Sequence, residues 1–195
     1  MINSYYHIMF LVEEPSMKAM LEGLLPNLIP DEIKYKCIAH EGKQDLEKSI
    51  PIKLRALKNI KRFIIIRDKD SADCKKVKQN LQQLCSQVNR SDTLIRIPCH
   101  ELEAWYLGDL KAVEKGLGIK DGKLSKLQNK KKYREPDNLA APKQELKKIA
   151  SSYQQISGSK AISPHMSQYN NTSKSFTFFI EGINKVVKEI KRHEN

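Results

Sequence analysis

Acidic side chains follow an apolar segment of the chain, where they could hold a divalent cation. Residues 62–67 are mostly large and apolar, and Asp68 and Asp70 come directly after them. Side chains of an extended chain repeat every second residue, so the two aspartates point the same way if the extended geometry continues. Their oxygens are hard ligands of the kind that Mg²⁺ prefers. The alternative is that Asp68 caps the next helix and Asp70 is a solvated turn residue.

Two further acidic pairs favour the metal site over that alternative. Glu13 and Glu14 end the first apolar segment, and Glu101 and Glu103 follow the fourth. In a parallel sheet the carboxyl ends of the strands lie at one edge, so these acids should converge. Like charges this close raise one another's pKa unless a cation lies among them. The residues alone leave open which glutamate of each pair faces the metal.

The acids must be positioned by a regular alternation of strands and helices. Apolar segments typical of buried strands occupy residues 5–12, 33–39, 62–67 and 93–98. Helical periodicity follows each of them, from about Pro15, Asp45, Ser71 and Glu101. This spacing is typical of βα units. It predicts an α/β fold with a mostly parallel central sheet that helices flank on both faces.

The second half of the chain is more basic and less periodic. Residues 111–138 are rich in Lys and Gly and predict a basic loop or short helices. Helical patterns return at 142–153 and 176–192, while 157–175 receives no assignment. We expect a single structural domain, in which residues 1–110 form the core and residues 111–195 pack on it as a basic loop and C-terminal helices.

Charge, hydrophobicity and cysteine spacing indicate the kind of partner and the compartment to expect. The 195 residues carry a net charge of +12, with a sequence pI near 9.5, which favours a polyanionic partner such as nucleic acid. No apolar run approaches the roughly 18 residues that span a bilayer, and the N-terminus lacks the pattern of a secretory signal, so we expect a cytoplasmic protein without membrane contact. The four cysteines lack Cys-x-x-Cys spacing, which predicts free thiols rather than a zinc site.

Several short motifs resemble a known fold. They are Leu11-Val12-Glu13-x-Pro15-Ser16, Ile64-Ile65-Ile66-Arg67-Asp68-Lys69-Asp70, Glu101-Leu102-Glu103-Ala104-Trp105, Arg134-Glu135-Pro136-Asp137, Pro142-Lys143-x-x-Leu146 and Ser175-Phe176-x-x-Phe179. In these motifs the chain resembles the Toprim fold, and in particular the small Toprim-like family catalogued as domain of unknown function 4276. The resemblance covers nearly the whole chain. It implies a Toprim-like three-layer fold with a C-terminal helical extension.

The resemblance also implies roles for individual residues. Toprim domains are found in topoisomerases, primases and nucleases of the overcoming-lysogenization-defect type. By that pattern Asp68 and Asp70 bind Mg²⁺ or Mn²⁺, Glu13 acts in acid/base chemistry, and Glu103 is a further metal or water ligand. Leu102 and Trp105 are expected in the core.

Two positions depart from the family pattern. The glycine that usually follows the first glutamate is Glu14, and the further acid of that turn is replaced by Met17. A glycine lets the backbone approach a phosphate closely, whereas a carboxylate adds negative charge beside the substrate path. Both changes leave the metal site intact and bear on turnover.

The leading hypothesis is a Mg²⁺-dependent Toprim-type nuclease or nicking enzyme, acting with a separate ATPase in anti-phage defence as the resemblance implies. Basic residues would neutralise the phosphate backbone without reading sequence, although each also has a plain interpretation as a solvated surface residue. The candidates are Lys69, Lys130, Lys131, Lys132 and Arg134.

Two other hypotheses stand beside it. The first is a catalytically weak nucleic-acid-binding or regulatory subunit that keeps the metal site. The second is a receiver-like phosphotransfer domain. The acids that follow the first strand argue against it, because they are glutamates rather than paired aspartates. The sequence leaves open DNA or RNA as substrate, one or two metal ions, and whether the chain forms a homo-oligomer.

Overall fold

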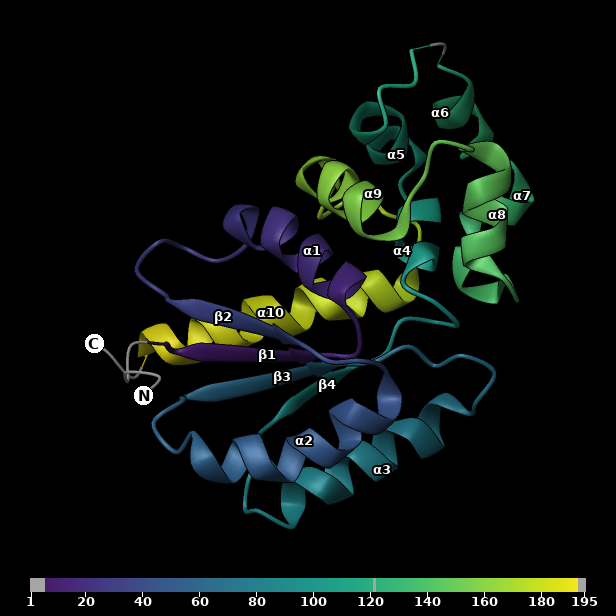
Figure 1. The fold of residues 1–195 in the computed structure, drawn as a ribbon. Helices are drawn as coiled ribbons and strands as arrows, with labels where there is room; N and C mark the ends of the chain where they lie inside the picture. Colours follow the sequence, from purple (N-terminus) through teal and green to yellow (C-terminus); the bar gives the residue numbers. More distant parts are fainter. Residues whose placement is uncertain (1–5, 121, 193–195) are drawn as a thin grey trace.

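Four parallel strands form the centre of the fold (Figure 1). The computed structural model describes residues 6–120 and 122–192. The strands are β1 (Ile8–Val12), β2 (Tyr35–Ala39), β3 (Arg62–Ile66) and β4 (Leu94–Arg96), in the order β2-β1-β3-β4. Val12 pairs with Ala39 and Ile66, so three strands end level with one another at the same edge of the sheet. All four strands were predicted, but each predicted segment is slightly longer than the observed strand. Residue 5, the first residue of the first predicted segment, lies outside the described part of the chain.

Helices cover both faces of the sheet, as the α/β prediction requires. The helices α1 (Pro15–Leu24) and α10 (Lys174–Arg192) lie on one face, and α2 (Lys43–Ala56) and α3 (Cys74–Ser86) lie on the other (Figure 1). Alternate strand residues serve the two faces: Phe10 and Ile64 pack with α1 and α10, while Leu11 and Ile65 pack with α2 and α3. This period of two produces two separate apolar cores, one on each side of the sheet.

A group of short helices lies beyond the carboxyl ends of the strands (Figure 1). It contains α4 (Glu103–Leu107), α5 (Leu110–Gly116), α6 (Lys123–Leu127), α7 (Lys131–Arg134), α8 (Pro142–Ile149) and α9 (Gln155–Ile162), with 3₁₀ turns at η2 (Pro136–Asn138) and η3 (Ser163–His165); a third turn, η1 (Leu25–Asn27), follows α1. The prediction of short helices in the basic stretch is confirmed. The stretch that received no assignment, residues 157–175, contains most of α9, which packs against α1. These helices place side chains over the edge of the sheet where the acids were expected.

Several predictions about individual side chains are also confirmed. Leu102 and Trp105 are fully buried in the core. All four cysteines are free thiols.

In the described ranges no helix is long and apolar enough to cross a membrane.

Three of the motif residues form one hydrogen-bonded network that joins α4, η2 and α10. The indole Nε1 of Trp105 donates to Ser175 Oγ at 2.9 Å. The Asp137 carboxylate accepts bonds from the Ser175 backbone amide at 2.8 Å and from the Ser173 hydroxyl at 2.7 Å. Asp137 therefore fixes the first turn of α10, the helix that covers one face of the sheet.

Replacing Asp137 should destabilise the fold. Asp137→Ala leaves the Ser175 amide and two hydroxyls without their acceptor, at a cost of about 2–3 kcal/mol of unfolding free energy. Urea denaturation measures the loss. Asp45→Ala is the matched control, because Asp45 is exposed and accepts a single exposed bond from the Glu41 amide. An equal effect of the two substitutions would contradict the structural role of Asp137.

Candidate active site

Three carboxylates, Glu13, Asp68 and Glu103, lie at the carboxyl edge of the sheet, where Glu13 and Glu103 are close enough to Asp68 to interact with it electrostatically, and they are called the carboxylate cluster below. Glu13 directly follows β1, Asp68 lies two residues after β3, and Glu103 begins α4. Asp68 is 7% exposed and Glu103 is 1% exposed. Burial, together with the charges of Glu13 and Glu103, raises the pKa of Asp68 well above its ordinary value. Acids far apart in the sequence therefore converge as predicted.

Two oxygens of the cluster are buried without a partner. Among residues 6–120 and 122–192, nothing donates a hydrogen bond to Asp68 Oδ1 or to Glu103 Oε2. The other Glu103 oxygen, Oε1, accepts a bond from the Tyr153 hydroxyl at 3.0 Å. A buried carboxylate oxygen without a donor is costly unless a proton or a cation neutralises it. This arrangement is the main feature that separates the cluster from ordinary caps and surface acids.

Glu13 is held against the backbone beside Asp68. Its Oε2 accepts a bond from the Asp68 amide at 3.1 Å and lies 3.9 Å from Nε of Arg67. Arg67 is itself fixed by a 2.7 Å ion pair with Glu47. Burial, followed by the charge of Asp70, raises the pKa of the Glu13 carboxyl. A glutamate with a raised pKa is suited to proton transfer near neutral pH.

Asp70 does not share the environment of Asp68, contrary to the simple alternation of an extended chain. The strand ends at Ile66, and Asp70 has a φ of 54°, in the left-handed region. Its side chain is 43% exposed, with Oδ2 at 3.5 Å from Lys43 Nζ. The backbone turns because the Asp70 amide bonds to the His100 carbonyl at 2.8 Å. Asp70 therefore lies on the solvent side of the cluster.

The capping interpretation of Asp68 is wrong. The cap of α3 is Asp73, whose side chain accepts a 2.9 Å bond from the Lys76 amide. Asp68 lies five positions earlier in the chain and is buried. Its carboxylate therefore does not cap α3; it accepts a bond from the backbone of Leu102, and its Oδ1 remains available for a ligand.

The structure also separates the members of each glutamate pair. Glu14 Oε1 accepts bonds from the Ser16 hydroxyl and from Gln155 Nε2, the latter at 2.9 Å. Glu101 Oε2 accepts from the Lys143 amide at 2.8 Å and so caps the first turn of α8. Glu14 and Glu101 are thus engaged by neighbouring helices. Glu13 and Glu103 remain the candidates for chemistry, as preferred from the resemblance.

Lys143 is the residue whose importance the sequence underestimated. In the sequence it stands out only as part of the motif Pro142-Lys143-x-x-Leu146, directly after the proline. Partial burial works against its charge, but the carboxylates of Glu103, Glu14, Glu101 and Asp68 together raise the pKa of Lys143. Lys143 therefore supplies positive charge to the carboxylate cluster from α8.

Removing that charge should destabilise the fold when no metal is present. Lys143→Met takes away the cation that offsets the buried acids, and we expect a loss of about 1 kcal/mol at pH 7.5 after discounting for solvent screening. The loss should shrink in acid as the carboxylates take up protons. Thermal unfolding in EDTA measures both effects. Gln144→Met on the same helix turn is the control, and equal behaviour of the two variants would argue against the assigned role.

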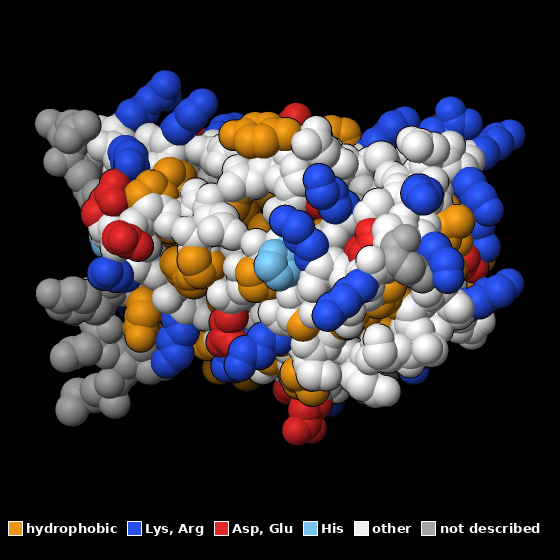
Figure 2. Space-filling model, turned by 90° about the horizontal axis from the view of Figure 1, so that it is seen from above, with side chains coloured by type: hydrophobic (Ala, Val, Ile, Leu, Met, Phe, Trp, Pro, Cys, Tyr) orange, Lys and Arg blue, Asp and Glu red, His pale blue; other side chains and the backbone are white. Residues whose placement is uncertain are grey.

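The predicted basic residues lie outside the cluster. Lys69 is closest in sequence, with Nζ at 3.4 Å from His100 Nε2. Lys131, Lys132 and Arg134 belong to α7, and Lys130 precedes it. Lys132 forms a 2.5 Å ion pair with Glu145. Figure 2 shows lysine and arginine side chains gathered over the end of the molecule that α5 to α8 form. Their contact with nucleic acid stays a prediction.

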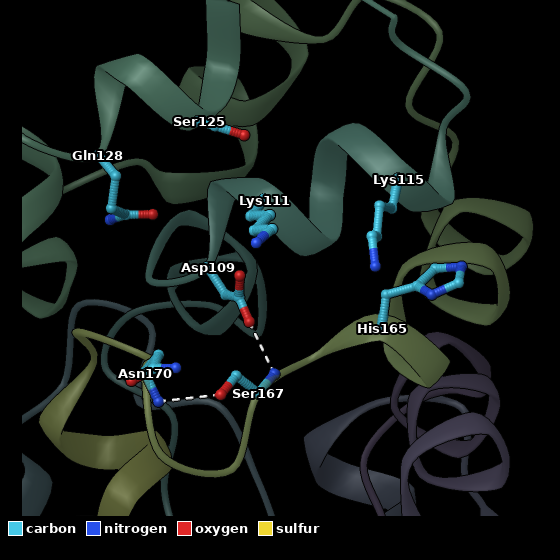
Figure 3. Close-up of a pocket in the computed structure, with 8 residues that line it drawn as sticks. All are labelled: Asp109, Lys111, Lys115, Ser125, Gln128, His165, Ser167 and Asn170. Carbon is cyan, nitrogen blue, oxygen red and sulfur yellow. Dashed lines mark hydrogen bonds between the residues drawn. The ribbon is translucent and has the colours of Figure 1, made fainter. Parts of the chain in front are cut away.

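A separate pocket of about 410 Å³ lies beside α5 (Figure 3) and is called the α5 pocket below. Lys111 and Lys115 from α5 and His165 from η3 line it. Asp109 at its floor caps α5 through the Ala112 amide and accepts a 2.7 Å bond from the Ser167 amide. None of the site residues predicted from the sequence lies in this pocket. It is a basic hollow, distinct from the carboxylate cluster.

Comparison with known proteins places the chain in a family. The model of the domain of unknown function DUF4276 matches residues 12–184. The chain belongs to the DUF4276 family. No curated protein matches it.

Two solved structures share the fold of this DUF4276 chain. The C-terminal region of the Burkholderia pseudomallei OLD protein is 13% identical, with a TM-score of 0.55 over 95% of this chain and 98% of that one. The C-terminal region of the Xanthomonas campestris pv. campestris OLD protein is 14% identical, with a TM-score of 0.55 over 97% and 98%. The predicted α/β fold with a parallel central sheet is thereby confirmed, and it is shared with the C-terminal regions of these two OLD proteins. At this identity the likeness concerns the fold alone.

Proposed function

We propose that this DUF4276 protein is a Mg²⁺-dependent Toprim-type nuclease or nicking enzyme that acts on nucleic-acid phosphodiesters. The observation that carries the proposal is the pair of buried, unpartnered carboxylate oxygens, Asp68 Oδ1 and Glu103 Oε2, at the carboxyl edge of the sheet. Buried carboxylates that repel one another are what a divalent cation would neutralise. The net charge of +12 supports a polyanionic substrate.

The donor set fits Mg²⁺ better than a metal held entirely by protein. Over the described ranges, no three or more His, Cys, Asp or Glu side chains form a group ready to hold a metal ion. Mg²⁺ keeps several waters and is usually bound through one or two carboxylates plus substrate phosphates. Asp68, with Glu103 or Glu13, would supply those carboxylates, and Asp70 would act from the solvent side. Mg²⁺ or Mn²⁺ bound there would polarise the phosphodiester and activate water.

The chain's own residues would perform the remaining steps. Glu13, fixed by the Asp68 amide, would accept the proton of the attacking water. Lys143 would offset the negative charge that builds up among the carboxylates and the phosphate. Lys69, next to Asp68 in the chain, would contact the substrate backbone, with Lys130, Lys131, Lys132 and Arg134 farther out. A separate ATPase and a role in phage defence belong to the same proposal, from the family resemblance.

The test is cleavage of supercoiled plasmid, single-stranded DNA and single-stranded RNA, with Mg²⁺ or Mn²⁺ compared with EDTA. The proposal expects metal-dependent cutting of at least one substrate that disappears in Asp68→Ala/Asp70→Ala. Salt-dependent binding of nucleic acid without any cutting would instead favour the catalytically weak subunit. One observation points that way: Glu14, where the family has glycine, is fixed in place by Gln155 and keeps a second negative charge near the site.

A further inference from the structure

A groove runs beside the outer strand β4. It encloses about 700 Å³ and is called the edge groove below. One side comes from α3, the floor from β4, and the other side from the first turns of α10. Lys69, between Asp68 and Asp70 in the chain, is among its lining residues. Lys69 therefore links the edge groove to the carboxylate cluster along the chain, although Glu13, Asp68 and Glu103 do not themselves line the groove.

The charged residues of the edge groove favour an anionic occupant. Lys69, Lys78 and Lys174 line it, and the latter two are exposed. Within the described part of the chain, neither Lys78 nor Lys174 has a carboxylate partner. The one acid of the groove, Asp137, already accepts bonds from Ser173 and Ser175. Three lysines therefore face the groove with little opposing charge.

An exposed aromatic ring completes the groove. Phe178 is 60% exposed, although it is a large apolar side chain. Its carbonyl accepts a 2.8 Å bond from Arg96 Nε, and Arg96 also bonds to the Ile95 carbonyl at 2.9 Å. Arg96 fits tightly because α10 has a glycine at 182, where a Cβ would lie 2.4 Å from Arg96 Nη2. The backbone at Phe178 is thus fixed to β4 while its ring stays open to solvent.

We infer that the edge groove binds single-stranded nucleic acid, with a base stacked on Phe178 and phosphates held by Lys78, Lys174 and Lys69. This inference rests on the proposed function, because it names the form of substrate that reaches the carboxylate cluster. Basic side chains along a groove combined with an exposed aromatic ring are how proteins hold single strands. In a duplex the base faces are already stacked, so the ring would have no base face to contact. A peptide partner without acidic residues would gain less from the three lysines.

The experiment is fluorescence anisotropy with a labelled oligothymidylate of about 12 nucleotides, within the range bound by single-strand proteins. EDTA is present, so that binding is measured without cutting. Phe178→Ala should weaken binding about tenfold, the expected loss of one stacked base. Phe178→Tyr keeps the ring and should bind as the wild type does. Tyr169→Ala is the aromatic control, because Tyr169 is 90% exposed and does not line the edge groove.

The lysines are tested through the salt dependence of binding. Lys78→Ala/Lys174→Ala should reduce the magnitude of the slope of log binding constant against log salt concentration by about 1.4. This change corresponds to the loss of two contacts with single-strand phosphates. The control with the same loss of charge is Lys111→Ala/Lys115→Ala in the α5 pocket, which should leave the slope unchanged (Figure 3). Equal effects of both pairs would mean diffuse attraction to a basic protein and would overturn the inference.

Protection of a thiol provides an independent check. Cys74 is exposed and lines the edge groove, whereas Cys37 and Cys85 are buried. The oligonucleotide should slow alkylation of Cys74 in the wild type and should do so less in Phe178→Ala. Unchanged alkylation at saturating oligonucleotide would contradict occupancy of the groove.

The outcomes separate this inference from the proposed function. Metal-dependent cleavage with unchanged oligonucleotide binding by Phe178→Ala would refute the groove and leave the nuclease standing. Weakened binding by Phe178→Ala without any cleavage would support the groove and refute the nuclease. Self-association that Phe178→Ala abolishes, in a protein that does not bind the oligonucleotide, would assign the groove to a second copy of the chain and refute the inference.

Discussion

Asp68→Asn should abolish metal-dependent cleavage, with a loss of at least about 10³-fold in rate, because it removes a charged ligand at the reacting centre. Asp70→Asn should cost less, about 10- to 100-fold, as is typical of a residue that supports a metal site from outside. The difference follows from their environments: Asp68 is buried with a free oxygen, while Asp70 is 43% exposed and faces Lys43. Initial rates at saturating Mg²⁺ measure both losses.

The control for this comparison is the fold itself. Thermal unfolding should show that both variants remain folded, since neither aspartate packs in the apolar cores. A loss in Asp70→Asn that equals or exceeds the loss in Asp68→Asn would place the metal on the solvent side and contradict the assignment of Asp68 as the central ligand.

The second large effect concerns stability and pH. Burial and the neighbouring carboxylates raise the pKa of Asp68 above its ordinary value of 3.8. Above that pH the folded state holds more protons than the unfolded state, so the contribution of Asp68 to stability falls as pH rises through its folded pKa. Asp68→Asn removes this cost. In EDTA the variant should match the wild type near pH 4 and exceed it by about 1–3 kcal/mol at pH 7.5.

Mg²⁺ should reverse this order of stability at pH 7.5 and make the wild type more stable than Asp68→Asn. At about 100 times its dissociation constant, a ligand that binds only the folded state adds ~2.7 kcal/mol. The wild type should gain this stability at pH 7.5, and Asp68→Asn should gain little. Urea denaturation with EDTA or Mg²⁺ at the two pH values provides all the comparisons. A wild type that is more stable than the variant at pH 7.5 in EDTA would contradict the description of Asp68 as a buried acid whose charge destabilises the metal-free fold.

The central sheet could be predicted from the sequence because its strands are locally encoded. Residues 63–66 are apolar on both faces, which is typical of a strand buried on both sides of a sheet. The convergence of Glu13, Asp68 and Glu103 followed from this, since parallel strands end at one edge.

The features that could not be predicted from the sequence depend on contacts between segments that are distant in the chain. The turn that separates Asp70 from Asp68 is formed by a bond to the carbonyl of His100, thirty residues later in the chain. Lys143 reaches the cluster because Glu101 caps α8. Helix α9 packs against α1, and Gln155 at its start donates a bond to Glu14, 141 residues earlier in the chain. None of these contacts leaves a local pattern.

The most direct test of the central claim is a count of bound Mn²⁺ by electron paramagnetic resonance, in the wild type and in Asp68→Asn, without nucleic acid. Mn²⁺ prefers the same oxygen ligands as Mg²⁺ and is detected directly. The carboxylate cluster predicts at least one Mn²⁺ bound by the wild type and competed by Mg²⁺, with affinity lost in Asp68→Asn. Equal Mn²⁺ binding by the two proteins would show that the buried carboxylates at the strand ends are not the metal site.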